Sequence, residues 1–246
     1  MPSSRLARSR KPRRGTELVC EWVFRPLAHP LVLLLARLRV PPPAVVLAAG
    51  AAGIAAAVEL GRGSLVAAAL LVQLKTLLDN ADGQLARLTG RTSAFGRYLD
   101  SELDLLVNAA LFAALGWATG EPTLALAGFV ALTSVLSLNF NVERLSRTAS
   151  AEPEAEGRAT ALRRIYGVVY APQDRLAEAL AARRPALTSP TAVSLLANLG
   201  MSTQLAAFGL LIALGHPLAF AWLALAEVVL VALALLPSRV PEEEVA

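Results

Sequence analysis

Long apolar runs separated by short polar turns dominate this chain. Six of the runs are about long enough to cross a bilayer as helices, which takes roughly 17–25 residues. They cover residues 43–60, 64–78, 98–119, 122–138, 189–214 and 217–236. The second run is short, so its helix is expected to continue beyond the lipid into the charged stretch that follows. The pattern predicts an all-α integral membrane protein with six transmembrane helices.

Polar segments flank and divide these runs. Residues 17–40 are apolar but interrupted by charged residues and prolines, among them Arg25, Pro26 and Pro30, which favours an amphipathic helix lying on the membrane surface. The predicted domains are a basic cytosolic arm (1–16), this interfacial helix (17–40), a six-helix domain (41–237) with a polar cytosolic segment (139–185), and an acidic tail (238–246).

The distribution of basic residues predicts the orientation. With the N-terminus in the cytosol, the outer turns fall near residues 60–63, 119–122 and 215–217, and Arg62 is the one basic residue among them. All other arginines and lysines then fall on the inner side or within the runs, which agrees with the positive-inside rule. We therefore expect a multi-pass protein of the inner or plasma membrane, with both termini in the cytosol.

Composition supports a membrane protein and excludes several kinds of site. Hydrophobic residues make up 55% of the 246 residues, and aromatic residues only 5%, so the apolar mass is mainly Ala, Leu and Val. A single cysteine, Cys20, excludes an intramolecular disulfide framework, and with only two histidines it argues against a zinc site of the usual ligand types. The expected partner surface is the lipid bilayer, and no nucleic-acid partner is expected.

Four aspartates stand where the second run ends and the third begins. Asp79 and Asp82 are three residues apart, and Asp100 and Asp104 are four apart, so each pair lies on one face of its helix. A short cytosolic turn makes these helices antiparallel neighbours whose acidic faces can meet. Clustered carboxylates at a membrane boundary stay ionised together only around positive charge, and oxygen ligands suit Mg²⁺ or Mn²⁺. The spacing predicts a site for such ions, with room for two.

Small residues accompany the acidic faces. Gly83 and Ala86 follow Asp79 by one and two turns, and Gly96 stands one turn before Asp100. Their small side chains leave room for a ligand beside the carboxylates. Arg87, at the cytosolic end, could meet a phosphate or brace a carboxylate.

Together these residues resemble the sequence pattern of the CDP-alcohol phosphotransferase (CDP-alcohol phosphatidyltransferase) family. The matching stretch reads Asp79-x2-Asp82-Gly83-x2-Ala86-Arg87-x8-Gly96-x3-Asp100-x3-Asp104. The resemblance implies that an alcohol hydroxyl attacks the β-phosphorus of a CDP-linked donor and that CMP leaves. It also implies membership of a family whose proteins are commonly homodimers.

The resemblance also assigns roles to residues. Asp79, Asp82 and Asp100 would be ligands of a pair of divalent ions, Mg²⁺ or Mn²⁺. Asp104 would be the general base on the acceptor hydroxyl and would also contact metal. The cytidine nucleotide would be lined by Gly83, Ala86, Arg87 and Gly96.

The start of the first run departs from the family. Many members carry Pro-Asn-x-x-Thr there, whereas Pro43 and Val46 stand here in place of the Asn and the Thr. Lys75 and Thr76 are candidates to compensate for the missing polar contacts. Lys75 could thus contact the donor phosphate, and the alternative is that it is a counter-ion for the aspartates or a snorkelling side chain.

The sequence says less about the identities of the donor and the acceptor than about the type of reaction. A lipid donor, CDP-diacylglycerol, is expected, and the basic cytosolic surface favours a phosphorylated acceptor such as inositol phosphate or glycerol phosphate. Arg144 and Arg147 are candidates to bind the acceptor phosphate, and the alternative is that they anchor the helix end by the positive-inside rule.

Three rival functions fit parts of the sequence. An intramembrane prenyltransferase also uses aspartates and Mg²⁺ on a pyrophosphate, but it would need two Asp-x-x-Asp motifs far apart. A transporter could carry intramembrane acids such as Glu227, but it gives no reason for the glycines and Arg87. A third possibility keeps the fold and lacks catalysis.

Overall fold

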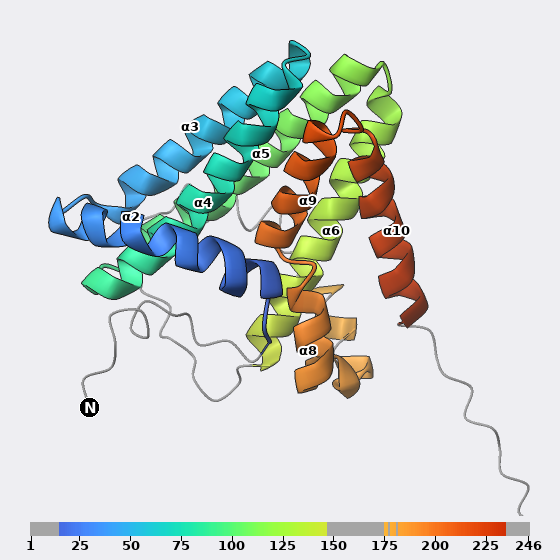
Figure 1. Cartoon of the computed structure of the whole chain (residues 1–246). Helices are drawn as coiled ribbons and strands as arrows, with labels where there is room; N and C mark the ends of the chain where they lie inside the picture. The colour runs from blue at the N-terminus through green and yellow to red at the C-terminus, as the bar shows by residue number, and fades with distance from the viewer. Residues whose placement is uncertain (1–14, 147–174, 177, 181, 235–246) are drawn as a thin grey trace, which may run out of the picture.

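Helices make up all of the regular structure in the part of the chain that the computed structural model describes, which is residues 15–146, 175–176, 178–180 and 182–234. Figure 1 shows their arrangement. The elements are η1 (Cys20–Phe24), α2 (Arg25–Arg37), α3 (Pro42–Gly61), α4 (Leu65–Thr89), α5 (Ala94–Thr119), α6 (Pro122–Ser146), η2 (Pro185–Thr188), α8 (Pro190–Ala197), α9 (Met201–Ala213) and α10 (Ala219–Ala234). The predicted all-α class is confirmed.

Four helical stretches of the described residues are long and apolar enough to cross a membrane. They are α3, α5, α6 and the combined stretch of α8 and α9, Pro190–Ala213. Helix α4 is not among them because Lys75, Asp79 and Asp82 put charge into its apolar run. Helix α10 is apolar, but its described part is only 16 residues long. Six spans therefore remain a prediction.

Helices α4 and α6 extend beyond the C-terminal ends of the predicted apolar runs, and α5 begins four residues before its run, at Ala94. Helix α4 continues past residue 78 to Thr89, as expected for a helix that outruns the lipid. Helix α6 continues to Ser146, so residues 139–146 of the predicted polar segment belong to the helix. The physical reason is that backbone hydrogen bonding does not end where side chains become polar.

The fifth predicted run is long and apolar enough to span, but it is not one continuous helix. It is interrupted between Ala197 and Met201. At the break, the side-chain amide of Asn198 donates to the carbonyl oxygen of Thr16 (2.8 Å), and its oxygen accepts the backbone N–H of Leu18 (2.9 Å). The N-terminal segment thus forms hydrogen bonds with Asn198 at the point where the helix is interrupted.

The predicted helix over residues 17–40 forms as η1 followed by α2. Pro26 lies in the first turn of α2, directly after the π-helical turn η1. Helix α2 packs on α4 through a small core made of Ala28, Val32, Val45, Ala81 and Leu85. Its place on a membrane surface stays a prediction. The predicted acidic tail, and the basic arm before residue 15, lie outside the described residues.

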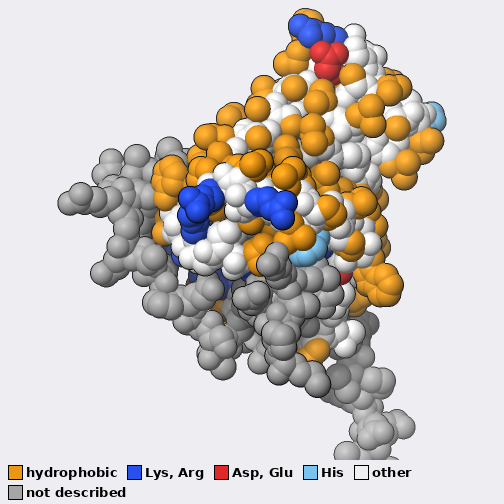
Figure 2. Space-filling model, turned by 60° about the vertical axis from the view of Figure 1, so that its left-hand side comes forward, with side chains coloured by type: hydrophobic (Ala, Val, Ile, Leu, Met, Phe, Trp, Pro, Cys, Tyr) orange, Lys and Arg blue, Asp and Glu red, His pale blue; other side chains and the backbone are white. Residues whose placement is uncertain are grey.

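The turns that follow α3, α5 and α9 lie at one end of the molecule, and the α4–α5 connection lies at the other (Figure 1). Hydrophobic side chains cover much of the described surface on the face drawn in Figure 2. Several large apolar side chains are exposed, including Trp117 at 82% and Leu70 at 66%. An apolar exterior of this kind suits a lipid surrounding.

Small residues allow the helices to approach closely. Helix α3 packs against both α4 and α5, whereas α4 and α5 make few backbone contacts with each other. A Cβ atom on Gly53 of α3 would lie 2.4 Å from Cγ1 of Val107 on α5, and one on Gly128 of α6 would lie 2.9 Å from Cα of Ala221 on α10. Close approach at small residues is the usual way in which helices associate in membranes.

We predict that Gly53→Ala destabilises the protein, because the added methyl group overlaps the buried, β-branched side chain of Val107. Overpacking of this kind costs about 1–3 kcal/mol, and the melting temperature in detergent should fall by several degrees. Gly61→Ala is the matched control, because its Cβ would lie 3.9 Å from that of Ala114, an ordinary contact. Equal melting temperatures for the two variants would contradict the proposed close contact.

Candidate active site

A tight connection turns the chain back between α4 and α5. Gly90 ends α4 in the left-handed conformation (φ 66°), which glycine adopts without strain. Ser93 begins α5 as its N-cap, and its hydroxyl accepts the backbone N–H of Gly96 at 3.0 Å. The glycine and the N-cap serine thereby define the short connection between the end of α4 and the start of α5.

The four predicted aspartates lie on facing parts of this pair of helices. Asp79, Asp82 and Asp100 each offer a carboxylate oxygen, and these oxygens lie within 4.8 Å of one another. Asp104, one turn beyond Asp100, reaches the cluster through Lys75. The predicted meeting of the two acidic faces is confirmed, and it occurs through side chains rather than through closely packed backbones.

The three oxygens fit a hard divalent cation. All are carboxylate oxygens, the ligand type that Mg²⁺ and Mn²⁺ prefer. Asp82 is 7% exposed, and its Oδ2 atom is buried without a hydrogen-bond partner among the residues that the structure describes. A buried carboxylate oxygen without a partner is costly, and a bound cation would satisfy it.

Lys75 links the two helices at the cluster. Its side chain is 2% exposed, and its Nζ atom donates to Oδ1 of Asp79 at 3.2 Å and to Oδ1 of Asp104 at 2.5 Å. Of the two roles considered from the sequence, this geometry matches the counter-ion. The position also puts a buried positive charge beside Asp104, the expected base.

The small residues leave space on the same helix faces. A Cβ atom on Gly83 would lie 3.2 Å from Nη1 of Arg87, so the glycine makes room for that guanidinium. A Cβ atom on Gly96 would come within 4 Å of Ser93 Oγ alone. Ala86 is half-buried between Gly83 and the end of α4. That these positions line a nucleotide stays a prediction.

The other predicted contacts lie elsewhere. Arg144 pairs with Glu178 at 2.6 Å, and both side chains are about half exposed. Arg147 lies outside the described residues. Thr76 is buried, and its hydroxyl donates to the carbonyl oxygen of Val72 at 2.8 Å, a local helix contact. Val46 is also buried.

Sequence reasoning missed a supporting network behind the cluster. Asn80, next to Asp79, donates to Oγ of Ser202 on α9 at 3.1 Å and accepts from Sγ of Cys20 at 3.0 Å. Glu17 accepts the backbone N–H of Thr203 at 3.3 Å. The signal for Asn80 in the sequence was a polar residue inside an apolar helix. Its partners could not be found in this way, because they come from segments distant in sequence.

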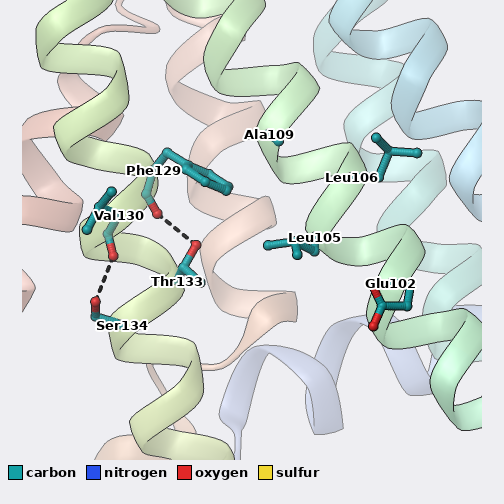
Figure 3. Close-up of a pocket in the computed structure, with 8 residues that line it drawn as sticks. All are labelled: Glu102, Leu105, Leu106, Ala109, Phe129, Val130, Thr133 and Ser134. Atoms are coloured by element: carbon teal, nitrogen blue, oxygen red, sulfur yellow. Dashed lines mark hydrogen bonds between the residues drawn. The ribbon is translucent and has the colours of Figure 1, made fainter. Parts of the chain in front are cut away.

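A cavity of about 510 Å³ lies on the opposite face of α5 from Asp100 and Asp104. Figure 3 shows that its walls are largely apolar side chains of α5 and α6, with Glu102 at one end. The hydroxyls of Thr133 and Ser134 donate to carbonyl oxygens of their own helix, those of Phe129 and Val130. Glu102 stands between two of the predicted aspartates, yet it faces away from them.

Comparisons with known proteins show what this chain is similar to. The family model described as CDP-alcohol phosphatidyltransferase matches residues 27–233. A phosphatidylinositol phosphate synthase of Corynebacterium glutamicum is 33% identical over 37% of this chain and 42% of its own length. An archaetidylinositol phosphate synthase of Aeropyrum pernix is 44% identical over 25% of this chain and 32% of its own.

A third relative is longer. A bifunctional IPC transferase and DIPP synthase of Thermococcus kodakarensis is 40% identical over 33% of this chain and 19% of its own length. The chain therefore matches less than half the length of each of these three relatives.

We predict that Mn²⁺ or Mg²⁺ raises the melting temperature of the protein and that Asp82→Asn abolishes this effect. A ligand at a hundredfold excess over its Kd stabilises by about 2.7 kcal/mol. Asp82→Asn removes a charged ligand while keeping the shape of the side chain. Glu121→Gln, an exposed acid in the turn between α5 and α6, is the control and should respond to the ions as the unmodified protein does. A full response in the Asp82 variant would exclude this cluster as the binding site.

Proposed function

This chain belongs to the CDP-alcohol phosphatidyltransferase family, and we propose that it transfers a substituted phosphate group from a CDP-linked donor to an alcohol, with release of CMP. The observation that carries the proposal is the group of three carboxylate oxygens, from Asp79, Asp82 and Asp100, within 4.8 Å of one another. Carboxylate oxygens that lie this close together on two helices can hold cations, and these cations would bind the pyrophosphate of such a donor.

Divalent ions, Mg²⁺ or Mn²⁺ and two in number by the family resemblance, would neutralise the pyrophosphate oxygens and polarise the phosphorus when bound. Asp79, Asp82 and Asp100 would hold them, with Asp104 as a further ligand. The buried Oδ2 atom of Asp82, which has no hydrogen-bond partner among the described residues, supports this assignment.

The remaining residues bind and orient the substrates. Gly83, Ala86 and Gly96 would line the cytidine nucleotide. The Arg87 guanidinium, for which Gly83 makes room, would donate hydrogen bonds to a phosphate of the donor. Helix α4 would thus contribute both cation ligands and the nucleotide contact.

Asp104 would act as the general base. Its carboxylate takes the proton from the acceptor hydroxyl while the hydroxyl oxygen forms a bond to the β-phosphorus of the donor. The bond from that phosphorus to the bridging oxygen breaks, CMP leaves with the bond's electron pair, and the proton passes from Asp104 to water. Its contact with Lys75 fixes the carboxylate at the cluster.

The relatives favour inositol phosphate as the acceptor. Two of them are named phosphatidylinositol phosphate synthase and archaetidylinositol phosphate synthase. Glycerol phosphate is the second candidate, and CDP-diacylglycerol is the expected donor. Arg144 and Arg147 remain candidates for the acceptor phosphate.

The proposal also includes the location, topology and assembly of the protein. We place the protein in the inner or plasma membrane, with six spans, cytosolic termini, a cytosolic active site and homodimeric assembly. Among the rivals, a prenyltransferase would give no role to Gly83, Arg87 and Gly96, and a transporter would give none to a base beside the cluster.

We predict that the purified protein in lipid releases CMP from CDP-diacylglycerol only with Mg²⁺ or Mn²⁺ and an alcohol acceptor, fastest with inositol phosphate. Asp104→Asn should lower the rate at least about 100-fold, because general-base catalysis contributes roughly 10²–10⁴. The Glu121→Gln variant should keep full activity. Turnover in the presence of excess chelator would contradict the proposed mechanism, and unchanged turnover in the Asp104 variant would remove its role as the base.

A further inference from the structure

We infer that Lys75 is an internal counter-cation that competes with divalent cations for the carboxylate cluster, and so sets how tightly the cluster binds them. The inference rests on the proposed function, because it concerns the cations of that same site. It gives Lys75 a positioning role that the family pattern does not include, since that pattern begins at Asp79.

The first argument is the position of the ammonium group. Lys75 lies one turn before Asp79 on α4, and its Nζ atom also reaches across to Asp104 on α5. Asp79 is at the same time one of the three residues whose oxygens form the cation group. The ammonium and a bound cation would therefore share a carboxylate.

The second argument is burial. The Lys75 side chain is 2% exposed, so its charge is not screened by water as a surface lysine would be. A cation held by Asp79, Asp82 and Asp100 would meet this positive charge at close range. Repulsion between them lowers the affinity of the site for the cation, and by reciprocity a bound cation weakens the hold of the cluster on Lys75.

The third argument is the state of the cluster without cations. Four carboxylates together repel one another, and two of them, Asp79 and Asp104, have Lys75 as a partner. Removing one partner of a buried ion pair is strongly destabilising. Lys75 therefore stabilises the fold when no cation is bound, and it lowers the affinity of the cluster for the cation.

The test compares Lys75→Met with the unmodified protein in the same lipid. The Kd for Mn²⁺ is measured by electron paramagnetic resonance of the free ion, and the melting temperature by tryptophan fluorescence. We expect the variant to melt lower without Mn²⁺, to bind Mn²⁺ at least tenfold more tightly, and to gain more stability from it. A residue with a merely structural role would lower both stability and affinity.

Arg62→Met is the matched control. It removes one positive charge from a salt bridge as well, that with Glu59 at 2.9 Å, but in the turn at the other end of the molecule. Its Mn²⁺ affinity should equal that of the unmodified protein.

A second pair of variants keeps the test valid if Lys75→Met does not fold. Asp104→Asn and the double variant Lys75→Met/Asp104→Asn differ only at Lys75, and the double variant should bind Mn²⁺ more tightly. Equal or weaker binding in the variant that lacks Lys75, or no Mn²⁺ binding by the unmodified protein, would overturn the inference.

The inference and the proposed function can fail separately. Tighter Mn²⁺ binding without Lys75 in a protein that never releases CMP would support the counter-cation and reject the function. CMP release that depends on Mn²⁺, together with a Mn²⁺ affinity unchanged by Lys75→Met, would support the function and reject the counter-cation.

Discussion

The need to compensate four clustered carboxylates governs this site. Asp79, Asp82, Asp100 and Asp104 come together from two helices, and like charges in a partly buried place repel strongly. One buried ammonium, that of Lys75, forms ion pairs with two of them, and Oδ2 of Asp82 has no hydrogen-bond partner within the described part of the chain. The Lys75 ammonium by itself does not balance four carboxylates, and such an excess of negative charge is what a site for divalent cations requires.

The surrounding helices hold this arrangement in place. Helix α3 packs against both α4 and α5, with Gly53 against Val107, and so connects the two acidic helices. Gly90 and Ser93 fix the turn between them. On the other side of α4, Asn80 is tied to Ser202 and Cys20. These contacts leave α4 little freedom to rotate and withdraw its aspartates from the site.

The site could be predicted from the sequence because its residues are close along the chain. A regular helix converts the spacings of Asp79, Asp82, Asp100 and Asp104 directly into faces, and the helical class followed from the apolar runs. The break between α8 and α9 and the network at Asn80 could not be predicted in this way. They depend on hydrogen bonds that Leu18 and Cys20 donate, and that Glu17 accepts, with partners far away in sequence. Periodicity carries no information about such partners.

The most direct test of this account is to locate the cation itself. Crystals of the full chain grown in lipid with Mn²⁺ and CDP would reveal the ion by its anomalous scattering. The account predicts an anomalous peak within about 2.5 Å of carboxylate oxygens of Asp79, Asp82 and Asp100. A saturated crystal with its Mn²⁺ bound elsewhere, and none at these three side chains, would contradict the central claim.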